Sequence, residues 1–225
     1  MSDQIAAMWP QRRTVLTGLI GAAASSLIGS SASAQALAGA MPAQPPVPLT
    51  SPLPFNAPAP ALLDRARAAM ERHRAALTST DLIGVADFSR HSSRVRFFIV
   101  DPVTGSSQAM LVAHGRGSDP AHSGWLQSFS AEPQSAATSA GAYVTGEGYE
   151  GQHGPSRRLS GLEPQNATAA DRAIVIHGAW YVDEAMIAQW GKIGRSEGCF
   201  AFCERDIATV LNRLGPGRLI YADKI

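Results

Sequence analysis

A histidine and a cysteine near the C-terminal end of the chain are the residues best suited to covalent chemistry. His177 follows the apolar run 173–176, which predicts a buried strand, and Gly178 comes directly after it. Cys199 lies in a glycine-flanked loop, just before a segment of helical character. A base and a thiol held at the ends of rigid elements are what nucleophilic catalysis requires. The chain has 2 cysteines in all, so this candidate nucleophile is nearly unique.

The spacing alone leaves three interpretations open. In the first, His177 activates the thiol of Cys199, whose pKa would otherwise be about 8.5, and amides near Gly198 bind the oxyanion of an acyl-transfer reaction. In the second, His177 and both cysteines bind a metal, although structural zinc needs four ligands. In the third, the residues are structural only. Two cysteines one helical turn apart lie too far apart for a disulfide, so we expect free thiols and a buried Cys203.

The N-terminus predicts export. Arg12 and Arg13 precede an apolar stretch over residues 16–28, and the small residues 32–34 fit a signal-peptidase site. We therefore expect residues 1–34 to be a twin-arginine signal peptide and the mature protein to be periplasmic or otherwise exported. The apolar stretch is broken by glycine and serine and falls short of the roughly 20 residues of a membrane helix. We expect no stable membrane span after cleavage.

Composition divides the remainder into a linker and one domain. Residues 35–60 are rich in proline and alanine, which predicts an extended spacer. Residues 61–225 are numerous enough to bury a hydrophobic core. The formal net charge of the 225 residues is +1, which argues against nucleic acid as a partner.

Within residues 61–225, helical spacing of apolar residues predicts a first helix over 61–78, and short strands dominate after Leu82. A turn at 101–105 predicts a hairpin. The expected fold is mostly β (α+β), with helices around a sheet. Expected strands are 94–100, 109–114, 142–147, 157–162, 173–176 and 218–221, and expected further helices are 183–190 and 204–214.

The order and spacing of the two reactive residues resemble a known enzyme motif. Papain-like peptidases place cysteine before histidine, whereas here residues 176–178 (Ile-His-Gly) precede residues 195–199 (Arg-Ser-Glu-Gly-Cys). This pattern resembles the L,D-transpeptidase (YkuD-like) motif, and most closely its divergent branch, the murein L,D-transpeptidase catalytic domain family. The commoner pattern of the family has histidine in place of Glu197, and asparagine or arginine in place of Ala201. Further stretches similar to the divergent branch are 86–89, 112–118, 143–147, 153–163 and 194–196.

The resemblance implies a fold, a reaction and a set of roles. The fold would be the L,D-transpeptidase catalytic fold, a curved mixed β-sheet or sandwich with flanking helices. Cys199 would attack a carbonyl of a peptidoglycan stem tetrapeptide, His177 would take the thiol proton, and the carbonyl of Gly178 would orient the imidazole. The thioester would pass to an amine of a second stem, forming a 3→3 cross-link. No metal or organic cofactor is expected.

The remaining expectations concern substrate binding and the fate of the thioester. The protein is expected to act as a monomer on peptidoglycan stem peptides. The same site could instead serve a hydrolase, as an L,D-carboxypeptidase or an amidase, or belong to a catalytically idle wall-binding module. Residues expected to shape the loop, bind the oxyanion or line the substrate cleft are Ser196, Gly198, Arg195, Tyr143, His114 and His153.

Overall fold

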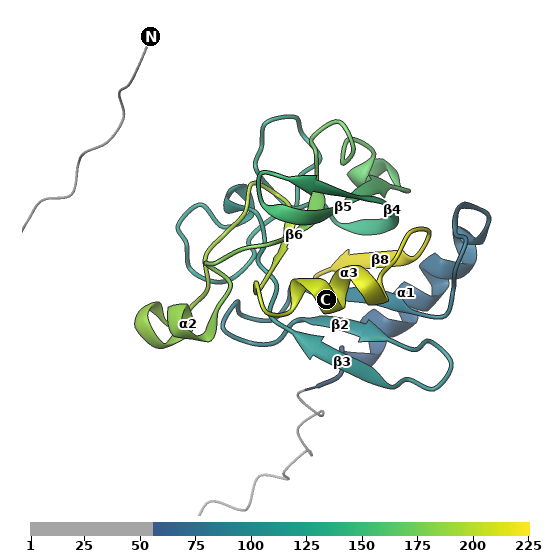
Figure 1. Ribbon diagram of the computed structural model, residues 1–225, viewed down its shortest axis with the longest axis horizontal. Coiled ribbons are helices and arrows are strands. Elements are labelled where there is room, and N and C mark those ends of the chain that lie inside the picture. Colours follow the sequence, from purple (N-terminus) through teal and green to yellow (C-terminus); the bar gives the residue numbers. More distant parts are fainter. Residues whose placement is uncertain (1–55) are drawn as a thin grey trace, which may run out of the picture. The chain divides into compact units, whose positions relative to one another are not determined.

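The computed structural model describes residues 56–225, which form one mixed sheet with helices on its two faces (Figure 1). The predicted signal peptide and most of the predicted linker lie outside the described residues. The helices are α1 (Pro60–Arg72), α2 (Glu184–Trp190) and α3 (Ile207–Arg213), with 3₁₀ turns η1 (Arg74–Ala76), η2 (Arg116–Ser118) and η3 (Pro164–Asn166). The strands are β1 (Ile83–Asp87), β2 (Phe97–Val100), β3 (Ser107–Met110), β4 (Gly141–Gly151), β5 (Gly154–Gly161), β6 (Val175–Gly178), β7 (Phe200–Phe202) and β8 (Leu219–Asp223).

The eight strands form a single sheet in the order β3-β2-β1-β8-β4-β5-β6-β7. Neighbours pair antiparallel except for β1 with β8 and β6 with β7, which are parallel. An isolated bridge between Ala113 and Ala201 joins the chain just beyond β3, one edge strand, to β7, the other edge strand. The sheet is therefore curved, and the fold is the expected α+β class.

The two faces of the sheet are covered by different helices. In Figure 1, α3 lies in front of the sheet and α1 lies behind it. Leu62 and Ala66 of α1 are fully buried against one face, and Val210 of α3 is fully buried against the other. Because both faces are covered, central strands such as β1 are buried along their whole length.

The first helix is shorter than the predicted span 61–78. α1 begins with Pro60 at its N-terminus, where a missing amide costs nothing, and it ends at Arg72. After η1 the chain leaves the helical path, because the amides of Thr78 and Ser79 both donate to the carbonyl of Gly217. A tertiary contact with the segment before β8 thus overrides the local helical pattern.

The end of the predicted linker is part of the folded domain. The carbonyl of Asn56 accepts a hydrogen bond from Ser107 at 2.7 Å, and that of Ala57 accepts one from Arg90 at 2.7 Å. These contacts tie the segment that leads into α1 to β3 and to the loop after β1.

The segment after Cys199 is a strand, so the expectation of a helix directly after it is wrong. Phe200 and Phe202 enter the core on one side of β7, and Ala201 enters a second cluster on the other. This alternation has the period of a strand, and the helix begins only at Ile207. Cys199 therefore has no helix N-terminus to stabilise its thiolate.

No helix within residues 56–225 combines the length and the apolar character needed to cross a bilayer.

The packing of α1 generates a stability prediction. Leu62 is fully buried, whereas the neighbouring Leu63 is only partly buried. Leu62→Ala should lower the free energy of unfolding by about 2–5 kcal/mol, because it leaves a cavity between helix and sheet. Urea denaturation followed by circular dichroism measures the loss, with Leu63→Ala as the matched control. Equal losses in the two variants would contradict this packing.

Candidate active site

At the end of β6, His177 makes a hydrogen bond with one edge of its ring and a stacking contact with one face. Its Nδ1 lies 2.8 Å from the carbonyl oxygen of Gly178. A carbonyl only accepts, so Nδ1 carries the proton and Nε2 is left as the base. The ring of His153 stacks on it, with centroids 4.4 Å apart. Burial lowers the pKa of His177, and the charge of His153 adds to this effect against the hydrogen bond to Gly178.

The thiol of Cys199 lies over the beginning of the same strand. Its Sγ is 3.6 Å from the carbonyl oxygen of Ala173, and the backbone amide of Val175 lies against it. Burial raises the pKa of this thiol, as does the negative charge of Glu197, whereas the Val175 amide and Arg172 act in the opposite direction. The resting site is therefore a neutral thiol beside a neutral imidazole.

The register of β6 and β7 places the two reactive groups on one side of the sheet. His177 pairs with Ala201, which lies two residues after Cys199. Side chains two residues apart in a strand point to the same face, about 7 Å apart along it. Cys199 lies just before β7, so this register places Cys199 and His177 near each other at one edge of the sheet, and their pairing as nucleophile and base stays a prediction.

Hydrogen bonds of Ser196 give the loop before Cys199 its shape. The Ser196 hydroxyl donates to the carbonyl of Cys199 at 2.7 Å and accepts from the amide of Gly198 at 3.2 Å. Its own amide donates to the carbonyl of His114, and its carbonyl accepts from Arg116. Ser196 therefore closes the loop on itself and ties it to the segment that follows β3.

Gly198 serves the backbone conformation of this loop. Its amide is already paired with Ser196, and its carbonyl accepts from the hydroxyl of Thr138. Its φ is +116°, a conformation that favours glycine. A Cβ at this position would lie 2.7 Å from Ile174 and 2.8 Å from the carbonyl of Ala137. Gly198 thus permits the tight backbone that the sequence indicated, while its own amide is engaged by Ser196, and oxyanion binding by this loop stays a prediction.

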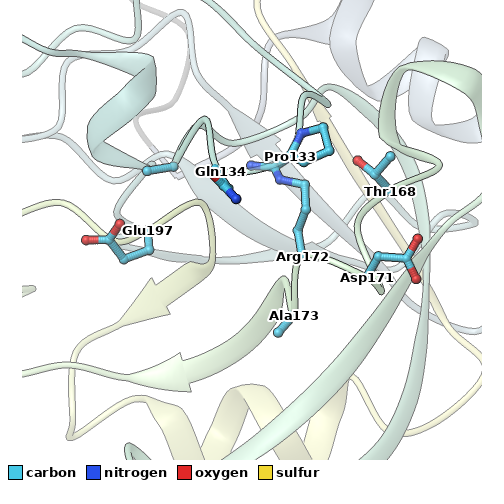
Figure 2. Close-up of a pocket in the computed structure, with 8 residues that line it drawn as sticks. Pro133, Gln134, Thr168, Asp171, Arg172, Ala173 and Glu197 are labelled. Atoms are coloured by element: carbon cyan, nitrogen blue, oxygen red, sulfur yellow. The ribbon is translucent and has the colours of Figure 1, made fainter.

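A pocket of about 420 Å³ lies beside the loop that precedes Cys199 and is lined in part by Glu197 of that loop (Figure 2). The carbonyl that Cys199 contacts belongs to Ala173, which lines this pocket. In Figure 2 the side chain of Arg172 extends between the two sides of the pocket, with Glu197 on one side and Asp171 on the other. The lining residues are Pro133, Gln134, Ala136, Thr168, Asp171, Arg172, Ala173 and Glu197.

The charged groups of the pocket are partly paired. The guanidinium of Arg172 donates to the carbonyls of Ser130 and Ala137 and to the hydroxyl of Ser139. Glu197 accepts from the exposed Arg116 at 2.8 Å. Arg172 thus holds one wall of the pocket in place, and Glu197 remains at its solvent-exposed rim.

Two residues expected to line the cleft are buried in the core. The ring of Tyr143 is fully buried, and its hydroxyl donates to the carbonyl of Ser139 at 2.7 Å. His114 is 1% exposed, with Nδ1 2.8 Å from the guanidinium of Arg96 and Nε2 3.5 Å from Asp119. Neither side chain can reach a substrate, so both expectations are wrong.

The other two expected substrate residues are placed differently. Arg195 donates one nitrogen to the carbonyls of Asp119 and Pro120, which engages part of the fork that a bidentate carboxylate contact needs. His153 is exposed and lies directly on His177. Of these two, His153 is the one in contact with the reactive pair.

Tyr181 belongs to the site although the sequence did not single it out. Burial raises the pKa of its hydroxyl to about 12, and the charges of Cys199 and Glu197 contribute to that rise. Its side chain packs so closely on Gly194 that a Cβ there would lie 2.6 Å from the Cβ of Tyr181 and 2.7 Å from its ring. The one sequence clue was its position between His177 and Cys199, in the interval the motif spans.

The two cysteines are free, as expected, and they lie at opposite ends of β7. The three residues of β7 lie between them, so the two cysteines are about 13 Å apart, which is too far for shared coordination of one metal. Cys203 is buried and its thiol lies 3.5 Å from Asp183. Within residues 56–225, no three side chains of histidine, cysteine, aspartate or glutamate gather as a metal site.

Comparisons with known proteins bear on this arrangement. Residues 57–222 match the sequence profile of a family described as L,D-transpeptidase catalytic domain. No curated protein matches the chain.

Solved structures similar to the chain include three described as L,D-transpeptidases. One from Mycobacterium tuberculosis shares 15% identity, covering 64% of this chain and 57% of that one, with a TM-score of 0.41. One from Mycobacterium smegmatis shares 14%, covering 64% and 58%, with a TM-score of 0.39. One from Xylanimonas cellulosilytica shares 13%, covering 70% and 68%, with a TM-score of 0.40. The chain spans less than two thirds of the two mycobacterial chains.

The conformation of Gly198 generates a prediction about the loop. Gly198→Ala should lower the free energy of unfolding by about 1–3 kcal/mol from backbone strain, and the two close contacts add to this loss. Gly191→Ala is the matched control, because Gly191 also has positive φ but nothing lies within 4 Å of its Cβ position. Urea denaturation compares the two variants. A loss no larger for Gly198→Ala than for Gly191→Ala would contradict the clash.

The buried His114 predicts a component of acid sensitivity. Burial, aided by the charge of Arg96, lowers its pKa from 6.5 to about 3. As the pH falls from 6.5 to 3, His114 becomes protonated in the unfolded chain but stays neutral in the folded state, so the free energy of unfolding falls. The slope contributed is up to about 1.4 kcal/mol per pH unit.

His114→Asn removes this titration and should make the pH dependence of stability shallower by that amount. Urea denaturation at several pH values between 7 and 4.5 gives the slope for each protein. Parallel slopes for wild type and variant would show that His114 is protonated in the folded state.

Proposed function

We propose that this chain, which belongs to the L,D-transpeptidase catalytic domain family, is an exported cysteine acyltransferase that acts on peptidoglycan stem peptides. The observation that carries the proposal is the register of β6 and β7, which places Cys199 and His177 near each other at one edge of the sheet. The thiol is half-buried and lies against the carbonyl of Ala173, which lines the pocket, and the imidazole is held through Nδ1, which leaves Nε2 as the base. A catalytically idle module would have no need of this arrangement.

In the proposed first half-reaction, a stem tetrapeptide enters the pocket and Cys199 attacks the carbonyl of its third residue. Nε2 of His177 takes the thiol proton as the C–S bond forms, and the resulting imidazolium gives that proton to the departing amine of D-alanine. Because burial disfavours both thiolate and imidazolium, the proton moves during attack rather than beforehand. The products of this step are a thioester on Cys199 and free D-alanine.

Two backbone groups assist this step in the proposal. The carbonyl of Gly178 accepts from Nδ1 of His177 and stabilises the imidazolium while it exists. The amide of Val175, which already lies against the thiol, is the donor placed to stabilise negative charge on the attacked carbonyl. This role was expected of the loop around Gly198, whose amide is engaged elsewhere.

In the second half-reaction, an amine of a neighbouring stem loses a proton to His177 and attacks the thioester. The amide formed is a 3→3 cross-link, and the thiol is regenerated. Water in place of the amine would make the same site an L,D-carboxypeptidase or an amidase. Both outcomes need the same Cys199 thioester and no metal or organic cofactor.

The proposed place of action follows from the N-terminal sequence. Residues 1–34 have the twin arginines, apolar stretch and small-residue site of an export signal, and the proposed substrate lies outside the cytoplasm. We further propose that the mature protein works as a monomer, since the pocket and both reactive residues come from one chain.

The proposal predicts a single acylatable thiol. Exposure of the purified protein to a carbapenem should add one adduct by intact mass, because a β-lactam carbonyl can be attacked like the scissile carbonyl. Cys199→Ala should abolish the adduct, whereas Cys203→Ala, which removes the buried thiol at the other end of β7, should retain it. Folded wild-type protein without an adduct would contradict the proposed thioester.

The product formed from disaccharide-tetrapeptide separates transfer from hydrolysis. Cross-linked dimers, absent with Cys199→Ala, support the transpeptidase. Tripeptide without dimers would assign the site to a hydrolase, and unchanged substrate would favour the wall-binding module.

A further inference from the structure

We infer that His153 is a positioning residue for the catalytic base, whose ring and charge keep the His177 imidazole oriented and unprotonated. The juxtaposition that carries the inference is the stack of the two rings, with centroids 4.4 Å apart and planes inclined by 24°. This deepens the proposed function, on which its catalytic meaning rests.

The β4–β5 hairpin is built so that its tip reaches the base. Gly151 pairs with Gly154, leaving Gln152 and His153 as the turn. Gly154 has a φ of +73°, and its carbonyl accepts from the hydroxyl of Ser156 at 2.9 Å. Ser156 in turn pairs with His177 across the β5–β6 ladder. The register of this ladder therefore brings the turn residue His153 over the ring of His177.

The stack with His153 restricts rotation of the His177 ring, a motion that the hydrogen bond from Nδ1 does not prevent. The bond from Nδ1 to the carbonyl of Gly178 holds an edge of the ring, but rotation about that bond would still be possible. The flat ring of His153 against one face removes this freedom. The amide of Gln152 lies 3.1 Å from Nε2 of His153 and holds the second ring in turn. His177 is thus fixed without any side chain at its Nε2.

The charge environment of His177 makes His153 its main electrostatic neighbour. β5 faces it with Ser156 and β7 with Ala201, while α3 presents Ile207 to Gly178. On the hairpin, the carboxylate of Glu150 lies near Gly154.

Of the described residues, His153 is the ionisable one whose charge acts on the pKa of His177, and it lowers that pKa. Two stacked imidazoles resist holding two protons, so a proton on His153 opposes one on His177. Nε2 of His177 therefore stays available as a base at lower pH than it would alone.

Two substitutions separate the ring from the charge. His153→Phe keeps a flat ring over His177 and removes the charge, whereas His153→Ala removes both. Because burial and the neighbouring charge both lower the pKa of His177, that pKa should rise in each variant, and more in His153→Ala. His153 is exposed at a turn, so both variants should fold.

The pKa of His177 can be measured directly by NMR titration of its ring C2 proton, assigned with His177→Gln. We expect a rise of about 0.5 to 1 in His153→Ala. His73→Ala is the control, because it removes a partly exposed histidine of the α1 end that pairs with Glu163 instead. An unchanged titration of His177 in His153→Ala would overturn the inference.

The kinetic consequence appears in the pH profile of carbapenem acylation. The acidic limb should move to higher pH in His153→Ala, so that acylation below its midpoint falls about three- to tenfold more than acylation on the plateau, where the loss of ring orientation alone is felt. An equal fall at every pH, with the limb in place, would mean a structural role alone and would overturn the inference. A wild-type protein that forms no carbapenem adduct would contradict the proposed function. The NMR titration needs no substrate, so it would still test the effect of His153 on His177.

Discussion

The site depends on the way that the loop 196–199 is held against the segment after β3. Ser196 bonds to the backbone on both sides of itself, and the hydroxyl of Thr138 joins the amide of Gly115 to the carbonyl of Gly198. These groups are buried, and buried polar groups that lose their partners cost about 1–3 kcal/mol each. The loop therefore has one low-energy shape, and that shape presents the thiol of Cys199 to the pocket.

The hydrogen bonds that hold the loop 196–199 also connect to a buried polar group of Arg96, His114 and Asp119. Arg96 donates to the carbonyl of Val112 and to His114, whose backbone carbonyl receives the amide of Ser196. Burial lowers the pKa of Arg96 to about 9 against the favourable charges of Asp119 and Asp87. This polar layer links the core to the loop, and its residues act by supporting the reactive pair rather than by touching substrate.

The reactive pair itself works with groups that burial keeps neutral. No helix begins directly after Cys199, and burial outweighs the favourable charge of Arg172, so the pKa of the thiol is raised while burial lowers that of the imidazole. In the proposed mechanism such a pair would react only with a bound carbonyl, since proton transfer would accompany bond formation. The stacking of His153 on His177 is consistent with this, because it acts on the base and not on the thiol.

Local patterns in the sequence determined the strand that carries His177, the glycine-flanked cysteine loop, the hairpin around 101–105 and the helix after Asp183, since each depends on periodicity or turn chemistry within a few residues. The family was likewise evident from the motif, and the match over residues 57–222 confirms it. The reactive pair was predicted from the same motif. Tertiary structure alone decided the rest. Tyr143 lies on an apolar strand that fits the core and a substrate wall equally well, and His114 lies in a glycine-containing loop, yet the fold buries both side chains. Phe200–Phe202 became a strand because β6 offered an edge to pair with, and His153 met His177 through the register of two strands. Contacts between residues far apart in the chain are set by packing and register, which no local pattern records.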